Sequence, residues 1–361
     1  MEHTAAYRDA TLARSLIQQI KNAGRHPARL MEVCGTHTVS IFRSGIRSVM
    51  PETISLLSGP GCPVCVTDQS DIDAFIALSD IKDVIVTTFG DLMRVPGSGT
   101  SLQQQKGEGR DIRVVYSTMD AVALAQKNSR KQVVFLGVGF ETTAPTIAAA
   151  IKAAEEMGLS NFSVFAAHKR VPPALNALMQ ADAVKIDGFI LPGHVSVVIG
   201  LQAYRPFFER YRVPCVVAGF EPVDILYAVQ QLVDQIENNS PQLANAYGRA
   251  VAENGNPSAR RLMAEIFDIG DAVWRGIGRI PRSGLYINAA YAAFDARCRF
   301  SLRVPAAREP EGCACGEILT GAKAPPMCPL FRSRCTPSNP VGPCMVSTEG
   351  TCAAYFRYGG Y

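Results

Sequence analysis

The sequence predicts an α/β protein with parallel sheets and a cysteine-rich carboxyl-terminal segment. From about Arg29, short apolar runs alternate with helical stretches, which is the pattern of buried parallel strands covered by helices. Three segments, at 84–96, 133–145 and 214–226, share a strand followed by a Gly/Phe turn with an acidic residue and a proline, which indicates two similar α/β domains. Six of the eleven cysteines lie in the last 49 residues, where long apolar runs are few.

The expected elements follow in chain order. Residues 5–23 form an amphipathic helix that ends near Gly24. Helices are expected to dominate from 223 to about 274. The expected strands are the apolar runs at 30–33, 54–57, 84–88, 133–136, 162–166, 188–191 and 213–217.

Length and composition suggest several domains, because a chain of 361 residues at about 150 residues per domain gives two or three. A charged tract at 106–113 marks an exposed loop or a boundary. The expected segments are an N-terminal helix at 1–28, a first α/β domain at 29–120, a second α/β domain at 121–235, and a helical, cysteine-rich domain at 236–361.

Charge and hydropathy exclude several classes of protein. The net charge of +4 is too balanced for a nucleic-acid or membrane-surface protein, and 47% hydrophobic residues exclude general disorder. No apolar run approaches the roughly 20 residues of a membrane helix. The polar start is not a secretory signal, so we expect a cytoplasmic protein, in which clustered cysteines bind metal or perform redox chemistry.

The six cysteines of the tail could serve one metal centre. Zinc sites usually contain two C-x2-C pairs, and the tail has none; the ferredoxin run is also absent. Six thiols exceed the four that a zinc ion or a cubane cluster needs, which leaves a spare pair for a redox-active disulfide. Spacing alone leaves a structural zinc site and an iron–sulfur cluster both open.

A second cysteine motif, GPGCPVC at 59–65, places Cys62 and Cys65 at the spacing of thiol–disulfide exchange, which is also half of a metal site. The Gly-Pro-Gly turn is expected to expose both thiols. Cys62 is expected near a helix start, which favours the thiolate. The alternative is a buried pair of small apolar side chains.

Further candidates lie at the ends of expected strands. In EVCGTH (32–37), Cys34 and His37 could bind a metal or form a nucleophile and its base, although such a pair is more often structural. Three acidic residues, Asp91, Glu141 and Glu221, are expected near clefts at the carboxyl ends of strands. The loop residue His194 either belongs to a functional site or is a polar residue whose hydrogen bonds are satisfied within its turn. Two more cysteines, Cys215 and Cys298, are expected in the core.

Several common catalytic motifs are missing. The chain has no Gly-x4-Gly-Lys-Ser/Thr loop, no G-x-S-x-G elbow and no H-E-x-x-H helix. The segment GVGFET (137–142) lacks the third glycine of a dinucleotide turn. A standard nucleotide site is therefore not expected.

Taken together, the motifs resemble the HypD family of nickel–iron hydrogenase maturation proteins over about 29–355. The motifs that do so are EVCGTHT, SGPGCPVCVT, TTFGDLMRVPGS, GVGFETTAP, LPGHVSVVIG, AGFEPVDIL and the terminal CACGEILTG, CPLF and GPCMVSTEGTCAAYF. The resemblance implies two similar α/β domains and a 4Fe-4S domain. It also implies a complex with the chaperone HypC, on which iron acquires two cyanides, delivered by HypE with HypF, and one carbon monoxide. The Fe(CN)2CO group then passes to the hydrogenase large subunit.

Carried onto this sequence, the resemblance implies roles for individual residues. Cys34 would bind the iron under assembly, shared with a HypC thiol, and Cys62 and Cys65 would be a redox-active pair. Cys315 and Cys344 would be an exchangeable pair near the cluster. The cluster ligands would be Cys313, Cys328, Cys335 and Cys352, and the groups that assist or handle protons would be His37, Asp91, Glu141 and His194.

Three functions follow as hypotheses. The first is a redox-active assembly scaffold rather than a conventional turnover enzyme. The second is a thiol–disulfide oxidoreductase that receives electrons from a tail cluster and reduces a protein disulfide. The third is a zinc-stapled binding protein. Cys34 distinguishes the first two, because only the scaffold needs it.

Overall fold

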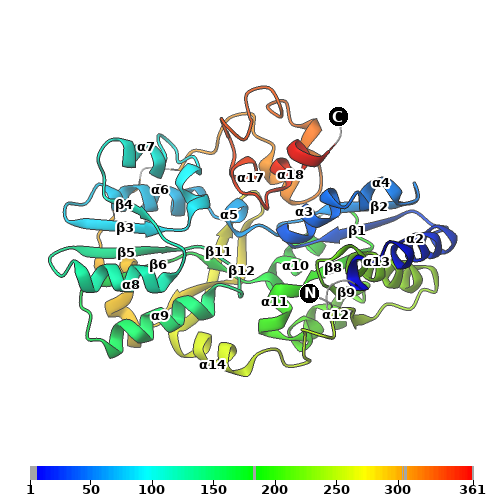
Figure 1. The fold of residues 1–361 in the computed structure, drawn as a ribbon, viewed down its shortest axis with the longest axis horizontal. Coiled ribbons are helices and arrows are strands. Elements are labelled where there is room, and N and C mark those ends of the chain that lie inside the picture. The colour runs from blue at the N-terminus through cyan, green and yellow to red at the C-terminus, as the bar shows by residue number, and fades with distance from the viewer. Residues whose placement is uncertain (1–5, 182–183, 303, 305–306, 360–361) are drawn as a thin grey trace.

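The computed structural model describes residues 6–359 apart from 182–183, 303 and 305–306, and it contains two parallel sheets and one antiparallel sheet (Figure 1). The two parallel sheets lie at opposite ends of the molecule in Figure 1, and the irregular tail lies over the region between them. No helix in the described ranges is long and apolar enough to cross a membrane.

The first parallel sheet has five strands, and its faces are covered by different helices. Alternate residues point to opposite faces: Leu30 and Ile190 pack with α2 (Ala10–Ala23) and α13 (Pro222–Glu237), and Met31 and Phe189 with the other face. That other face is covered by α10 (Val171–Gln180), α11 (Gly193–Ile199) and α12 (Arg205–Tyr211). The strand order is β10 (Leu243–Asn245), β9 (Cys215–Ala218), β8 (Gly188–Pro192), β1 (Ala28–Glu32) and β2 (Ile54–Ser58).

Three of the four strands of the second parallel sheet are almost entirely buried, as their continuous apolar runs predict. The fourth, at Ile112–Val114, begins inside the charged tract where a loop or boundary was expected, and only Ile112 is buried. Helices α8 (Thr118–Lys127) and α9 (Ala144–Glu156) cover one face, and α6 (Gln69–Ser79) covers the other. The strand order is β4 (Ile112–Val114), β3 (Val84–Thr88), β5 (Gln132–Gly137) and β6 (Phe162–Ala166). The predicted parallel strands are therefore confirmed.

The antiparallel sheet corrects one prediction. After α14 (Pro257–Ile266), the chain forms strand β11 (Phe267–Trp274) where helices were expected, followed by β12 (Gly278–Ile287). Exposed and buried side chains mix along β11, so it lacks the continuous apolar run that marks the other strands. Gly276, at a φ of 72°, permits the tight turn between β11 and β12.

The chain crosses between the two parallel sheets, so each sheet takes strands from both expected α/β segments. Segment 29–120 supplies β1 and β2 to the first sheet and β3 and β4 to the second. Segment 121–235 supplies β5 and β6 to the second sheet and β8 and β9 to the first. The crossing from β2 to α6 contains residues 59–66, and this places the GPGCPVC motif at the junction between the sheets.

The tail consists of short helices joined by irregular chain. Helix α18 packs against α3 (Gly35–Arg43), and α17 packs against α5 (Pro63–Val66). These contacts hold the tail against the sheet junction, where α3 begins after Cys34 and α5 begins after Cys62. The tail helices are α16 (Cys315–Leu319), η5 (Pro325–Met327), α17 (Pro343–Val346) and α18 (Thr351–Tyr358).

Candidate functional site

Cys34 lies where strand β1 gives way to helix α3. It is the N-cap residue of α3 and is 8% exposed. The GPGCPVC loop presses against it: Gly35 N–H donates to the Gly61 carbonyl at 3.0 Å. A Cβ at Gly61 would lie 2.2 Å from the Cys34 nitrogen, so only glycine permits this approach. The loop sequence thus brings the first thiol beside the C-x2-C pair.

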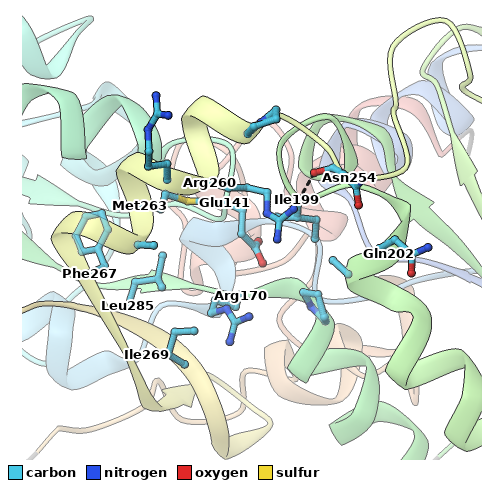
Figure 2. A pocket seen from close by; sticks show the side chains of 15 residues that line it. Glu141, Arg170, Ile199, Gln202, Asn254, Arg260, Met263, Phe267, Ile269 and Leu285 are labelled. Carbon is cyan, nitrogen blue, oxygen red and sulfur yellow. Dashed lines mark hydrogen bonds between the residues drawn. The ribbon is translucent and has the colours of Figure 1, made fainter.

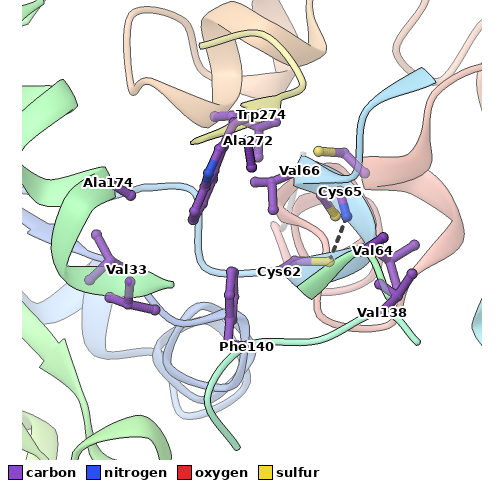
Figure 3. Packing of buried hydrophobic residues seen from close by; sticks show 14 of the residues in the cluster. Val33, Cys62, Val64, Cys65, Val66, Val138, Phe140, Ala174, Ala272 and Trp274 are labelled. Carbon is purple, nitrogen blue, oxygen red and sulfur yellow. Dashed lines mark hydrogen bonds between the residues drawn. The ribbon is translucent and has the colours of Figure 1, made fainter. Parts of the chain in front are cut away.

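Cys62 and Cys65 lie on the short helix α5. Cys62 is its N-cap residue, as predicted, and the Cys65 N–H donates to Cys62 Sγ at 3.3 Å (Figure 3). The prediction that the turn exposes both thiols is wrong, because they are 3% and 0% exposed. Phe140, Trp274 and the tail cover them, and burial raises the pKa of Cys65 well above its ordinary value.

Thiols of the tail continue the series that begins with Cys62 and Cys65. Cys65 Sγ lies 3.8 Å from the Pro343 carbonyl, and its thiol interacts with that of the next residue, Cys344. Cys344 Sγ in turn lies 3.1 Å from Cys315 Sγ. Four thiols from two distant parts of the sequence therefore follow one another in space, in the order Cys62, Cys65, Cys344 and Cys315.

All six tail cysteines line one small apolar cavity of about 10 Å³, together with Leu330, Phe331 and Met345. Contact with the Cys315 thiol, and then burial, raises the pKa of Cys313, and burial raises that of Cys335. Within the described ranges, no three or more His, Cys, Asp or Glu side chains are close enough together to hold one metal ion. A cluster is larger than this cavity, so the lining side chains would have to shift to admit one.

A buried arginine stands beside this cavity. Arg275, at the turn between β11 and β12, is 3% exposed, and its backbone N–H and Nε donate to the carbonyls of Val66 and Thr67 at 2.9 and 3.0 Å. Its Nη2 is buried and has no partner among the described residues. The adjacent Gly276 packs on Gly316, where a Cβ would meet the Gly316 Cα at 2.1 Å. The turn therefore brings a fixed positive charge between α5 and α16.

Two carboxylates that the sequence analysis missed flank Cys34. Glu32 Oε2 accepts from the Cys34 N–H at 2.9 Å, and burial raises the pKa of Glu32 to about 8. Glu349, from the tail, accepts from Thr36 Oγ1 at 2.7 Å. Burial, with both carboxylates, raises the pKa of Cys34 to about 12. An acidic residue at the end of an apolar strand was an available signal for Glu32, whereas Glu349 depends on how the tail folds back.

The two histidines of the predicted site meet through one aromatic ring. Phe220 stacks on His37 at 4.7 Å and on His194 at 3.9 Å between ring centroids. His37 Nε2 lies 2.8 Å from the Gly219 carbonyl, and burial lowers the pKa of His37 to about 4, so its ring is neutral at pH 7. His194 has its pKa lowered by burial and interacts with Glu349.

The predicted acidic residues lie in different places. Asp91 accepts from Ser347 Oγ of the tail at 3.2 Å. Glu221 caps α13 and forms an ion pair with Arg8 at 2.6 Å. Glu141 lines a separate cavity, where its oxygens accept from the Val171 N–H at 3.1 and 3.2 Å.

The two remaining cysteines differ from each other. Cys215 is buried in the core of the first sheet, as predicted. Cys298 was expected in the core, and this is wrong, because the short helix α15 (Ala296–Arg299) places it at the surface with its thiol 3.6 Å from Asp295 Oδ2.

Glu141 gives a pH-dependent prediction. Burial raises its pKa from 4.5 to about 7, against the opposing effect of Arg170, so the folded chain retains a proton that the unfolded chain releases between these values. The stability from the protonated carboxyl is therefore complete below about pH 4.5 and is lost as pH rises through about 7. We expect Glu141→Gln to become more stable relative to wild type over that range, by on the order of 1–3 kcal/mol.

Thermal melting at a series of pH values checks this prediction. Glu156→Gln, at an exposed position, is the matched control and should follow the wild type throughout. A Glu141→Gln melting curve that stays parallel to the wild type between pH 4.5 and 7 would contradict the prediction.

Known proteins resemble this chain over nearly its full length. The family model described as "HypD: Hydrogenase formation hypA family" matches residues 11–359. The hydrogenase maturation factor HypD of Rhizobium leguminosarum is 46% identical, and the match covers 99% of this chain and 96% of that protein. HypD of Rhodobacter capsulatus is 45% identical over 100% of this chain and 99% of its own length.

A third relative, HypD of Azotobacter vinelandii, is 44% identical over 99% of this chain and 97% of its own length. The family model and these relatives cover the junction loop, both α/β sheets and the cysteine-rich tail. The chain therefore belongs to the HypD family of hydrogenase maturation factors.

Proposed function

We propose that this maturation factor is a redox-active scaffold that holds iron through Cys34 while the Fe(CN)2CO group is assembled. The observation that supports this most is the convergence at the sheet junction. The Cys34 segment packs on the GPGCPVC loop, and the thiols of that loop lead to Cys344 and Cys315. In this proposal a HypC-type chaperone shares the iron, and a HypE-type protein delivers cyanide. Both partners and the hydrogenase large subunit would be met in the cytoplasm.

Iron is the substrate of this site, and Cys34 is suited to binding it. The Cys34 thiol, with its pKa raised to about 12, is protonated at pH 7, so binding of iron displaces the proton and is coupled to its release. A thiolate supplies electron density to low-spin iron(II) that carries cyanide and carbon monoxide. Glu32 and Glu349 flank this position and can accept protons, and the neutral His37, whose ring lies on the Gly219 carbonyl, is in the first turn of α3, three residues after Cys34.

The tail cavity fits a 4Fe-4S cluster in donor chemistry. It offers six soft sulfur donors within apolar walls, and the unpartnered Arg275 Nη2 beside α16 can offset the negative charge of a thiolate-bound cluster. A cubane takes one thiolate per iron, so its ligands need not converge on one ion. We assign the ligands as Cys313, Cys328, Cys335 and Cys352. When bound, such a cluster supplies electrons one at a time.

The remaining thiols can pass an electron pair to the junction loop. The Cys344 thiolate attacks Cys65 Sγ of a Cys62–Cys65 disulfide, the S–S bond breaks, and Cys62 leaves as a thiolate that takes up a proton. Cys315 then attacks Cys344 and releases Cys65. Cys62 and Cys65 are thereby reduced by two electrons, and Cys315 and Cys344 are oxidised to a disulfide. The 3.1 Å between Cys315 and Cys344 Sγ supports this pairing.

The experiment that tests the scaffold is anaerobic co-purification with a HypC-type partner, followed by infrared spectroscopy of the cyanide and metal-carbonyl stretches. We expect bands in the wild type, no bands in Cys34→Ala, and unchanged bands in Cys215→Ala, which removes a buried thiol elsewhere in the first sheet. Bands that persist in Cys34→Ala would overturn the ligand. Absence of bands in every sample, with partner bound, would favour the oxidoreductase.

Burial argues against the oxidoreductase. Cys62 and Cys65 are 3% and 0% exposed, so the disulfide of another protein cannot reach them in this conformation. The scaffold needs only small ligands and electrons at the junction.

A further inference from the structure

A cavity of about 710 Å³ lies away from the thiol succession, where the two parallel sheets and helix α14 meet (Figure 2). The second sheet contributes Glu141, from the turn after β5, and the first sheet contributes Ile199 and Gln202, from its helical layer. Helix α14 contributes Arg260. This volume is typical of small-molecule sites in proteins.

The cavity contains two arginines that form no direct ion pair among the described residues, although Arg170 and Glu141 interact electrostatically. Arg170 donates to the Arg282 carbonyl and Arg260 to the Asn254 carbonyl, both at 2.9 Å. Neither guanidinium forms an ion pair with a carboxylate within 4.0 Å in the part of the chain that the structure describes. Arginines with free donors are the usual partners of carboxylate and phosphate oxygens.

Glu141 does not cancel this charge as an ordinary carboxylate would. It is 3% exposed, and burial raises its pKa to about 7, so a substantial fraction is neutral near that pH. Its oxygens accept hydrogen bonds from the backbone N–H groups of Val171 and of Glu141 itself, which are both donors. The proton of the neutral carboxyl therefore needs an acceptor, and an anionic oxygen in the cavity would serve.

Apart from Gln202, Asn254 and Arg261, the rest of the lining is apolar. Met263, Phe267 and Leu285 form part of the wall beside these polar groups (Figure 2). A ligand that satisfies both parts has an anionic head and an apolar body. We propose that this cavity binds a small organic anion, a carboxylate or a phosphate monoester, with its head on Arg170 and Arg260 and its body against Met263 and Phe267.

The cavity is linked to the thiols through Phe140, the neighbour of Glu141 in sequence. Phe140, which precedes Glu141, stacks on Trp274 at 5.8 Å between centroids, and both rings pack in the same buried cluster as Cys62 (Figure 3). Trp274 is the single tryptophan of the chain. Its fluorescence can therefore report binding in the cavity.

Titration calorimetry on the full reduced chain tests the proposal, with phenyl phosphate and benzoate as probes and benzyl alcohol as the neutral control. We expect at least one anion to bind with a change in Trp274 fluorescence, and the alcohol not to bind. Arg170→Gln and Arg260→Gln should each weaken binding roughly tenfold or more. Arg260→Lys should restore part of it, and Arg14→Gln, at an exposed helix position, should leave it unchanged.

The two anions distinguish the head group, since tighter binding of one identifies a phosphate or a carboxylate site. The proposal is overturned if neither anion binds, if the alcohol binds equally, or if both glutamine variants bind as wild type. Because Arg260 is exposed on α14, its replacement should not unfold the chain, and thermal melting checks this. Anion binding in this cavity does not require iron at Cys34, so failure of this proposal would leave the scaffold proposal untouched, and the reverse also holds.

Discussion

Serine in place of Cys335 is expected to abolish retention of iron and acid-labile sulfide by the purified chain, whereas serine in place of Cys344 should leave both in place. Both side chains line the same tail cavity. Serine is a poor ligand for a cluster that selects thiolates, so loss of one of four ligands removes the centre. Cys344, with its Sγ 3.1 Å from Cys315 Sγ and in contact with Cys65, is assigned instead to disulfide exchange.

Anaerobic iron and sulfide analysis after reconstitution measures the first effect. Mass-spectrometric trapping of thiols after mild oxidation measures the second, and Cys344→Ser should lose the Cys315–Cys344 disulfide. Cys298→Ser is the matched control, because this thiol lies at the surface in α15. Retention of a full cluster in Cys335→Ser, or its loss in Cys344→Ser, would reverse the partition. Zinc without sulfide in the wild type would replace the cluster with a structural zinc site.

Much of the fold was predictable from sequence because the buried parallel strands are short and continuously apolar. Strand β3 at Val84–Thr88 and strand β6 at Phe162–Ala166 match the predicted bounds. Strand β11 was missed because charged and exposed residues interrupt its pattern. Sheet membership was not predictable, since nothing local in 54–58 or 84–88 says that the chain crosses to another sheet between them.

The candidate site, too, was predictable from the sequence only in part. Cys34 was predicted at the end of a strand and Cys62 near a helix start, and the structure places both at helix N-caps. The burial of Cys65 depends on a tail almost 280 residues further along the chain, as its contact with the Pro343 carbonyl shows. Arg275 and Glu349 acquire a place near the thiols only when the hairpin and tail pack at the junction. Such residues have no signal in a single sequence.

Alanine in place of Gly61 is expected to destabilise the protein strongly and to abolish iron binding at Cys34. The added Cβ would lie 2.2 Å from the Cys34 nitrogen and 2.4 Å from its Cα. These are backbone atoms, so no rotamer change relieves the clash, and the loop or the start of α3 must move. Overpacking of this kind costs about 3 kcal/mol or more, and the melting temperature of the metal-free chain should fall accordingly. Gly99→Ala is the control, because its Cβ would meet nothing within 4 Å.

The expected loss of stability and the expected loss of iron binding can be measured separately, because the clash lies where the GPGCPVC loop contacts the Cys34 segment. A Gly61→Ala chain that still folds at low temperature must have moved residues 59–65 away from Cys34, breaking the 3.0 Å bond between the Gly35 N–H and the Gly61 carbonyl. It should therefore fail to form the cyanide and carbonyl bands even where its circular dichroism is native. If the variant instead melts like Gly99→Ala and forms the bands, the loop does not press on Cys34. The close approach of Cys34 and the C-x2-C pair would then have no part in assembling the iron group.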